Sequence, residues 1–476
     1  MGESVRFVDL FAGLGGFHVG LKRLGHECVL ASEIDEKLRK VYRQNFDPFQ
    51  ASSDPSFPIL GDIREISLED VPEHEVLCAG FPCQPFSKAG AQQGLECPRW
   101  GDLFDFVIRV IGHRKPNYFI LENVPNIEKH DGGRTWESIL EKLRDPEWGY
   151  DVGVQRLSPH EFGIPQIRKR VFIAGSRVEG ALQGFTSLKP PKNMSPNIRD
   201  VLDTPPVGAR ALPTHYLECL KVWQEFMQQL HRREGGLPSF PIWSMEFGAT
   251  YPYKETTPYA CSLEELRQFR GSFGRSLGEV SKEDLRTALP SHALRKQKRF
   301  PRWKRNFIAA NRSLYDRNRE WLDPWIPKIS TFATSLQKLE WNCKGEEPEI
   351  WRYVLQFRSS GVRVKRPTTA PSLIAMTTTQ IPVIAWEKRF MTMRECARLQ
   401  GMDELKYLPE DATSAFKALG NAVNADLVTH LAAALLNQHP SDGIEGSSSS
   451  LSESASNARY IDSRDVSDSG SKANVA

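Results

Sequence analysis

A cysteine held between two prolines is the residue of this sequence best suited to nucleophilic chemistry. Cys83 lies in the segment 80–85, GFPCQP, directly after an apolar run. Proline fixes its own φ and restricts the residue before it, so this loop is stiff. A free cysteine is more often a small buried hydrophobe, and a reactive one needs its pKa lowered from about 8.5. A rigid position at the functional edge of a sheet shifts that balance toward a nucleophile.

Three further polar residues lie next to apolar runs, and each has a plain structural alternative. Glu122 follows the run 118–121, where burial would raise its pKa and make it a proton donor; helix capping or a salt bridge is the alternative. Arg168 and Arg170 precede another apolar run and share one face if the segment is extended. Phosphate or a carbonyl oxygen would be their target, and a solvated basic edge is the alternative.

A glycine turn follows the first apolar run. Gly13 and Gly15 allow close approach of a ligand to the backbone and point the amides of the next helix at it. A dinucleotide fingerprint wants a third glycine at position 18, where this chain has His18, which weakens an NAD interpretation. Glu33, about 20 residues further on, suits the hydroxyls of a ribose, and a solvated surface glutamate is the alternative.

These residues need a sheet to position them. Between residues 1 and 180, short apolar runs alternate with helix-like stretches, the pattern of βαβ units in a mostly parallel sheet. Glu33, Asp62, Cys83 and Glu122 each come just after such a run, so we expect them at one edge of the sheet, where α/β folds bind ligands. The predicted strands are 5–11, 28–31, 59–60, 76–79, 118–121 and 171–174, and a helix is predicted from about 17 to Gly25.

Length and composition indicate a globular protein and argue against membrane, secreted and zinc-binding classes. A chain of 476 residues with 40% hydrophobic and 25% charged residues is longer than one average domain, so we expect two domains or one large insertion. No apolar stretch reaches the roughly 18 residues of a membrane helix, and residues 1–11 show no secretory signal. The eight cysteines show neither C-x-x-C pairs nor zinc-site spacing with histidine, so we expect no metal.

Positive charge is concentrated in the middle of the chain. Residues 181–370 contain 31 Lys and Arg and 19 Asp and Glu, a net charge of +12, which leaves −9 for the rest of a chain of net charge +3. This excess indicates a polyanionic partner, most simply nucleic acid. The densest cluster, 295–305, contains no acid and interleaves Phe300 and Trp303, which suits a surface that binds phosphates and bases; a solvated charge run is the alternative.

Two amphipathic helices are also predicted. Apolar residues recur at helical spacing between 216 and 230, before Gly235, and again between 427 and 435.

Taken in order, these segments resemble the DNA (cytosine-5) methyltransferase family, of the bacterial restriction–modification type. Residues 9–16, DLFAGLGG, resemble its S-adenosylmethionine loop, and 82–84 and 122–124 resemble its nucleophile and acid motifs. Gln166, Arg168 and Arg170 match its Q-x-R-x-R motif. Residues 394–401 and 420–423 resemble its last two motifs, and 367–379 its recognition segment. The resemblance covers residues 1–180 and 365–437.

The resemblance implies a Rossmann-like α/β sheet of the S-adenosylmethionine-dependent type and a second, basic target-recognition domain. The expected division is 1–180 for cofactor binding and catalysis, 181–385 for target recognition, 386–438 for a segment completing the catalytic domain and 439–476 for a disordered, serine-rich tail.

The resemblance also implies S-adenosyl-L-methionine as methyl donor and S-adenosyl-L-homocysteine as product. Glu33 would bind the ribose and Asp62 the adenine amine. The implied cofactor-binding residues are Phe11, Gly13, Gly15, Glu33, Ile34, Asp62, Ile63, Pro82, Leu103, Asn421 and Ala422. The stretch 96–104 is one residue longer than its family counterpart, and Ala422 stands where serine is common.

Catalysis would then use four residues. Cys83 would be the nucleophile, Glu122 would hold the N3 and amino edge of the cytosine, and Arg168 and Arg170 would lie near the base carbonyl and Cys83. We expect a methyl group to pass to C5 of a cytosine flipped out of a specific duplex DNA site, through a Cys83–C6 adduct.

The expected partner is double-stranded DNA, with a restriction endonuclease acting on the same site; we expect a monomer in the bacterial cytoplasm, at the nucleoid. One alternative is an RNA (tRNA) cytosine-5 methyltransferase, because the catalytic residues alone do not distinguish the two substrates. The other is a catalytically silent DNA-binding protein of the same fold. The basic insertion argues against the first alternative, and the presence of both Cys83 and Glu122 argues against the second.

Overall fold

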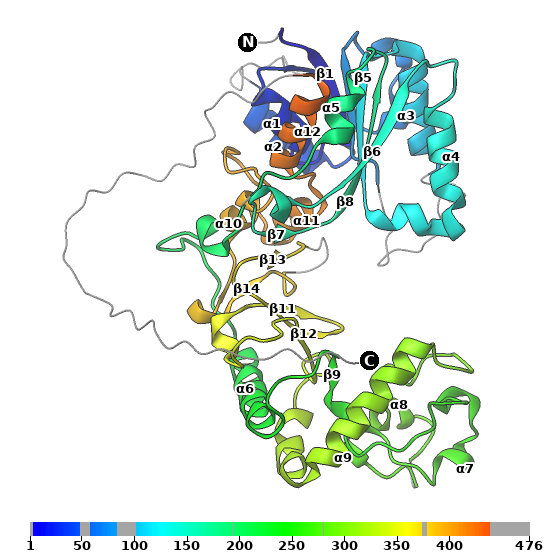
Figure 1. The fold of residues 1–476 in the computed structure, drawn as a ribbon, viewed down its shortest axis with the longest axis vertical. Helices are drawn as coiled ribbons and strands as arrows, with labels where there is room; N and C mark the ends of the chain where they lie inside the picture. The colour runs from blue at the N-terminus through cyan, green and yellow to red at the C-terminus, as the bar shows by residue number, and fades with distance from the viewer. Residues whose placement is uncertain are drawn as a thin grey trace, which may run out of the picture. The chain divides into compact units, whose positions relative to one another are not determined.

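In the computed structural model, the N-terminal part of the chain forms a seven-stranded sheet (Figure 1). Its order is β3-β2-β1-β4-β5-β8-β6; the strands from β3 to β5 pair in parallel, and β8 is antiparallel to both of its neighbours. All six predicted strands are confirmed. The strands are β1 (Arg6–Leu10), β2 (Glu27–Ser32), β3 (Ile59–Leu60), β4 (Val76–Ala79), β5 (Tyr118–Asn123), β6 (Asp151–Leu157) and β8 (Arg170–Ser176).

The structure describes residues 3–47, 58–82, 101–192, 194–278, 280–373 and 378–437. They belong to one compact unit, Met1–Pro440. Cys83 and the predicted tail from 439 onward lie outside the described residues. In the described ranges, no helix is long and apolar enough to cross a membrane.

Different helices cover the two faces of the first sheet. Because side chains alternate along a strand, Val8 and Leu10 of β1 pack with α3 (Gly101–Arg114) and α4 (Arg134–Leu143). Phe7 packs on the other face with α1 (Gly16–Lys22), α5 (Leu182–Ser187) and α12 (Ala425–Leu435). The Thr429 hydroxyl of α12 donates to Gly20 O of α1 at 3.2 Å, so a C-terminal segment completes the sheet's cover.

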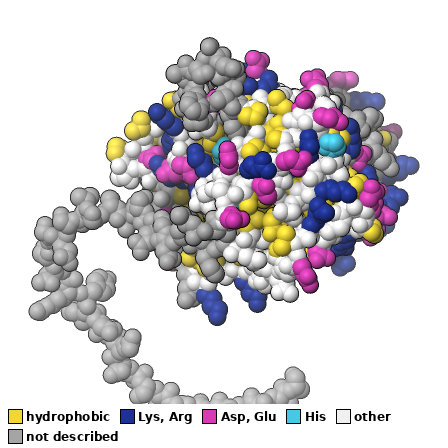
Figure 2. All heavy atoms as spheres, turned by 90° about the horizontal axis from the view of Figure 1, so that it is seen from above, with side chains coloured by type: hydrophobic (Ala, Val, Ile, Leu, Met, Phe, Trp, Pro, Cys, Tyr) yellow, Lys and Arg dark blue, Asp and Glu magenta, His cyan; other side chains and the backbone are white. Residues whose placement is uncertain are grey.

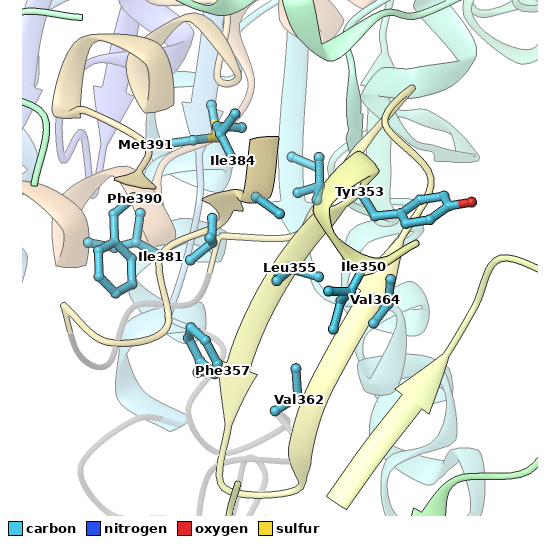
Figure 3. Packing of buried hydrophobic residues seen from close by; sticks show 14 of the residues in the cluster. Ile350, Tyr353, Leu355, Phe357, Val362, Val364, Ile381, Ile384, Phe390 and Met391 are labelled. Atoms are coloured by element: carbon cyan, nitrogen blue, oxygen red, sulfur yellow. The ribbon is translucent and has the colours of Figure 1, made fainter. Parts of the chain in front are cut away.

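A six-stranded sheet forms in the middle of the chain, in the order β15-β14-β11-β12-β10-β9. Its apolar side chains, among them Leu355, Phe357, Val362 and Val364, pack together as Figure 3 shows. The strands are β9 (Ile242–Trp243), β10 (Lys338–Trp341), β11 (Val354–Arg358), β12 (Gly361–Lys365), β14 (Val383–Ile384) and β15 (Arg389–Phe390).

Two long helices pack on this second sheet through one apolar cluster. Trp223 and Phe226 come from α6 (Thr214–Glu234), and Trp325 comes from α9 (Arg302–Ser330). The predicted helix over 216–230 is confirmed by α6, which ends at Gly235 with a left-handed φ of 73°.

The other α-helices of the described residues each have between four and eleven residues. They are α2 (Glu36–Phe46), α7 (Leu263–Leu266), α8 (Leu285–Ala288), α10 (Met393–Arg398) and α11 (Ala412–Asn421). The predicted helix over 427–435 is confirmed by α12.

A two-stranded pairing joins the two parts of the chain. β7 (Gln166–Ile167) runs directly before β8 of the first sheet, and β13 (Ala370–Pro371) follows β12 of the second. They pair in parallel, with Gln166 opposite Ala370. Part of 367–379, which resembles the family's recognition segment, therefore contacts the segment 166–170 that contains Arg168 and Arg170.

Candidate functional site

The carboxyl ends of the parallel strands bring the predicted acids to one edge of the first sheet. Glu33 directly follows β2, Asp62 follows β3, and Glu122 is the penultimate residue of β5. The backbone N–H of Glu33 donates to Leu60 O of β3 at 3.0 Å. Pro82 follows β4 at the same edge. The sheet order reverses between β1 and β4, which is where folds of this kind bind ligands.

The glycine turn after β1 is a left-handed loop fixed by Glu33. Phe11, Gly13 and Gly15 have φ values of 60°, 56° and 86°. The Gly13 N–H donates to Glu33 Oε2, and the Asp35 N–H donates to Glu33 Oε1, both at 2.9 Å. Burial raises the pKa of Glu33, and these two backbone donors oppose the rise. A Cβ added at Gly13 would meet no atom within 4 Å, so the loop borders open space.

Apolar surface lies beside this loop. Phe11 packs against the cluster that contains the buried residues Ile63 and Leu103. Ile34, next to Glu33, leaves 65% of its surface exposed and so provides an apolar face that a flat ring can cover. Together with the Glu33 carboxylate, these residues fit a nucleoside ligand.

Asp62 has a partner that the sequence analysis did not single out. Its Oδ1 accepts hydrogen bonds from Arg64 Nε and from the Arg64 backbone N–H, both at 3.0 Å. The side-chain hydrogen bond from Arg64 lowers the pKa of Asp62 and so favours its ionised form, and Arg64 donates to both of its carboxylate oxygens. In the sequence, the only indication of this pairing is that Arg64 stands two residues after Asp62.

Glu122 and Arg170 form a buried ion pair across β5 and β8. Arg170 Nε lies 2.7 Å from Glu122 Oε1, and the two side chains are 16% and 11% exposed. Burial raises the pKa of Glu122, while the charges of Arg170 and Arg168 oppose the rise. The structure therefore shows both the raised pKa that the sequence predicts for Glu122 and the salt bridge that was the alternative. A carboxyl of this kind can donate a proton closer to neutral pH than an ordinary glutamate can.

Arg168 makes different contacts. It is buried, and its guanidinium donates to the carbonyl oxygens of Leu373, Gly420 and Ala422 at 3.1, 2.8 and 3.1 Å. Nearby, Gln166 Nε2 donates to Leu399 O at 3.2 Å. The segment 166–170 thus contacts both Glu122 and the C-terminal part of the chain.

The last predicted cofactor residues lie between the start of α1 and the end of β4. Asn421 is exposed at the end of α11, and Ala422 is buried. A Cβ added at Gly16 would lie 2.3 Å from Val423 O, and one added at Gly80 would lie 3.1 Å from Val423 Cγ2. The backbone around Asn421 therefore approaches the glycine loop closely.

The basic cluster 295–305 is divided between surface and core. Phe300 is only 2% exposed and packs with Ile308, so the prediction that it belongs to a binding surface is wrong. Lys304 is also buried, and its Nζ donates to His292 O at 3.2 Å. Trp303 is 54% exposed. The exposed cations of the cluster are Arg295, Lys296, Lys298, Arg299 and Arg302.

Charge on the face drawn in Figure 2 is mixed. Figure 2 shows that basic and acidic side chains alternate over the face drawn there, between small apolar patches. The segment 295–305 contains no acid of its own, but its exposed Arg299 pairs with Glu255 at 2.8 Å.

The family of the chain follows from the motifs and from this geometry. Residues 5–437 match the family model for C-5 cytosine-specific DNA methylases, and the chain belongs to that family. It is an S-adenosyl-L-methionine-dependent DNA (cytosine-5) methyltransferase whose relatives are methyltransferases of restriction–modification systems.

Three relatives illustrate the range of similarity. Type II methyltransferase M.AluI of Cellulosimicrobium cellulans is 31% identical over 495 residues, which cover 89% of this chain and 90% of the relative. Type II methyltransferase M.BanI of Aneurinibacillus aneurinilyticus is 46% identical over 36% of this chain and 38% of its own. Type II methyltransferase M.HhaI of Haemophilus parahaemolyticus is 38% identical over 39% of this chain and 54% of its own.

Proposed function

We propose that the protein methylates C5 of a cytosine flipped out of a specific duplex DNA site, through a covalent bond between Cys83 and C6. One observation carries the proposal: the buried Glu122–Arg170 pair lies at the same sheet edge as Pro82, the residue directly before Cys83. The proposal puts the nucleophile just after β4 and the proton donor near the end of β5, and these two strands are parallel neighbours.

The chemistry explains why both groups are needed. Cytosine C5 is too weak a nucleophile to be methylated unaided. When the Cys83 thiolate bonds to C6, the electrons of the C5–C6 double bond become available at C5, and Glu122 gives its proton to N3. The sulfonium of bound S-adenosyl-L-methionine supplies the methyl group. Transfer of the C5 proton to a water molecule then expels the Cys83 thiolate, and the N3 proton returns to Glu122.

Arg170 has two proposed tasks at this site. Its charge opposes the effect of burial on the pKa of Glu122, so the carboxyl can both give and regain a proton. We also place its guanidinium near the carbonyl of the flipped base, since an arginine fork can donate to a carbonyl oxygen while it pairs with a carboxylate.

The cofactor site is proposed around the glycine loop. Glu33 would accept from the ribose hydroxyls, Ile34 would cover the adenine ring, and Asp62 would accept from the adenine amine. The open space at Gly13 and the exposure of Ile34 support this placement. The other residues proposed to line the site are Phe11, Gly15, Ile63, Pro82, Leu103, Asn421 and Ala422.

The division of labour along the chain is part of the proposal. Residues 1–180 and 386–438 would form the catalytic domain, since α12 packs on the first sheet, and 181–385 would read the DNA. Two elements cross these boundaries: α5 (Leu182–Ser187) packs on the first sheet, and the second sheet ends with β15 at Arg389–Phe390.

The partners follow from the relatives. Because the relatives carry the names of type II methyltransferases, we propose a restriction endonuclease that acts on the same DNA site. We also propose that the protein acts as a monomer. We place it in the bacterial cytoplasm, at the nucleoid.

Labelled methyl transfer tests the function. The protein is incubated with S-adenosylmethionine labelled in its methyl group and with either duplex DNA or tRNA, and label should enter DNA only. Bisulfite sequencing of DNA from cells expressing the protein then identifies the methylated cytosine and its site. Label in tRNA alone would support the RNA alternative, and label in neither would support the silent DNA-binding protein.

A further inference from the structure

We propose that Arg168 is a positioning residue that couples the cofactor site to the DNA-recognition segment, and that it does not contact the flipped base. The inference rests on the proposed function, which assigns residues 420–422 to the cofactor site and 367–379 to DNA recognition. We call the backbone of 420–422 the cofactor wall and the backbone of 370–373 the recognition stem.

The two ends of one guanidinium reach these two structures. Nη2 of Arg168 donates to Gly420 O at 2.8 Å and to Ala422 O at 3.1 Å, on either side of Asn421. Nη1 donates to Leu373 O at 3.1 Å and approaches the Ser372 hydroxyl at 3.4 Å. Only 3% of the residue is exposed, so these carbonyls replace the water that a charged group needs.

The bridge requires an arginine. A guanidinium is a planar fork with five N–H donors, so it can serve carbonyls on two sides at once. The lysine ammonium has three donors on a single nitrogen and cannot span the same gap. Lysine at position 168 would therefore keep the charge near Glu122 but lose one side of the bridge.

The recognition stem is held from the second sheet as well. Gln356 of β11 is 1% exposed, and its Nε2 donates to Gln380 O at 2.8 Å and approaches Ser372 O at 3.5 Å. On the side of the first sheet, the Ala370 N–H donates to Pro165 O at 2.6 Å within the β7–β13 pairing (Figure 1). The stem is thus a joint between the two sheets, and Arg168 connects this joint to the cofactor wall.

Arg168 is also close to the proposed proton donor. It stands two residues before Arg170, and its charge is one of the two that oppose the rise in the pKa of Glu122. A shift of the stem or of the wall changes the hydrogen bonds of one shared side chain. Binding of DNA at the stem and of cofactor at the wall should therefore be energetically linked, and the linkage must be reciprocal.

The test measures this linkage in the full-length protein. The dissociation constant of a duplex containing the methylated site is measured by fluorescence anisotropy, with and without saturating S-adenosylhomocysteine. The ratio of the two constants reports the coupling, and allosteric couplings typically give ratios of about 5 to 150. We expect wild-type protein to lie in this range and R168K to fall within about twofold of one.

Arg389 supplies the matched control. It is equally buried, but its guanidinium pairs with Glu395 and Glu387, neither of which belongs to the wall or the stem. R389K should keep the wild-type ratio even where its melting temperature falls as much as that of R168K. An equal loss of coupling in both variants would overturn the proposal, as would a wild-type ratio in R168K.

A second measurement needs no variant and applies even if R168K fails to fold. Hydrogen–deuterium exchange of wild-type protein should slow in peptides covering 366–373 when S-adenosylhomocysteine binds in the absence of DNA. Unchanged exchange there, in protein whose glycine loop does become protected, would overturn the proposal. Protein that methylates DNA but shows neither effect overturns this inference alone, whereas protein that neither binds the cofactor nor methylates DNA overturns the proposed function.

Discussion

Replacing Arg170 with methionine should expose the cost of burying the charge of Glu122. Methionine keeps much of the volume of the side chain but removes the cation that lies 2.7 Å from Glu122 Oε1. In the variant, the carboxylate remains buried without its main counter-charge. Breaking a buried pair from one side is strongly destabilising for this reason.

The distance between Arg170 Nε and Glu122 Oε1 sets the size of the expected destabilisation. At 2.7 Å and an effective dielectric constant of about 20, the attraction is 332/(20 × 2.7), or about 6 kcal/mol. Measured costs of removing one partner of a buried pair are about 3–5 kcal/mol. Because the two side chains keep 16% and 11% exposure, we take the lower end and expect R170M to lower the free energy of unfolding by about 3 kcal/mol at pH 8.

The sign of the pH dependence follows from the raised pKa of Glu122. A carboxyl whose pKa is higher in the folded than in the unfolded protein destabilises the fold above the folded pKa, and this penalty disappears as the pH falls below the unfolded value. Removing Arg170 raises the folded pKa further. The cost of R170M should therefore be smaller at pH 5 than at pH 8.

A double-mutant cycle in urea separates this effect from lost packing. In the E122Q background there is no carboxylate that could lose its partner. R170M should therefore lower the free energy of unfolding by no more than about 1 kcal/mol there, which leaves a coupling free energy of about 2 kcal/mol. Equal costs of R170M in both backgrounds, or a cost that grows as the pH falls, would refute the ion-pair reasoning.

Three further predictions follow from the site and the surface. E33A should weaken binding of S-adenosylmethionine at least about tenfold in calorimetry, since a charge-assisted hydrogen bond contributes about 1.5–3 kcal/mol; unchanged affinity would remove Glu33 from the cofactor site. G16A should destabilise the protein by about 1–3 kcal/mol, because the added Cβ would lie 2.3 Å from Val423 O, and an unchanged melting temperature would contradict that close approach. The double variant R295A/R302A should reduce the slope of log affinity for DNA against log salt by about 0.9 for each phosphate that the protein no longer neutralises, whereas an unchanged slope would show that these cations are merely solvated.

The strands of the first sheet could be predicted because each central strand is a short apolar run. β4 and β5 are buried on both faces and follow that rule. β6 was missed because its sequence, DVGVQRL, contains a glycine and charged residues, and only part of the strand is buried. An edge strand of this kind has no continuous apolar signal.

α9 was missed for a different reason. Its buried face recurs at helical spacing, but Lys304, Asn311 and Asn318 belong to that face. The Asn311 side chain accepts from the Trp243 N–H at 2.7 Å and donates to Pro241 O at 3.0 Å, so its burial is compensated by hydrogen bonds that the sequence does not reveal. The apolar periodicity is broken wherever such a polar residue stands.

The residues of the candidate site also fall into those that the sequence could place and those that it could not. Glu33, Asp62 and Glu122 could be placed because the carboxyl ends of parallel strands meet at one edge. The hydrogen bonds of Arg168 could not be predicted. Its acceptors are backbone carbonyls 205 to 254 residues further along the chain, and any residue type can supply a carbonyl. The placement of Cys83 remains a prediction from its motif.

Trapping of a covalent intermediate tests the central claim most directly. A duplex that carries 5-fluorocytosine at the methylated position is incubated with wild-type protein and S-adenosylmethionine, and the product is digested and analysed by mass spectrometry. Fluorine cannot leave C5 as a proton does, so we expect a stable adduct on the peptide containing Cys83, and none with C83S. Protein that methylates ordinary duplex DNA but forms no adduct, or forms it at another residue, would contradict the account.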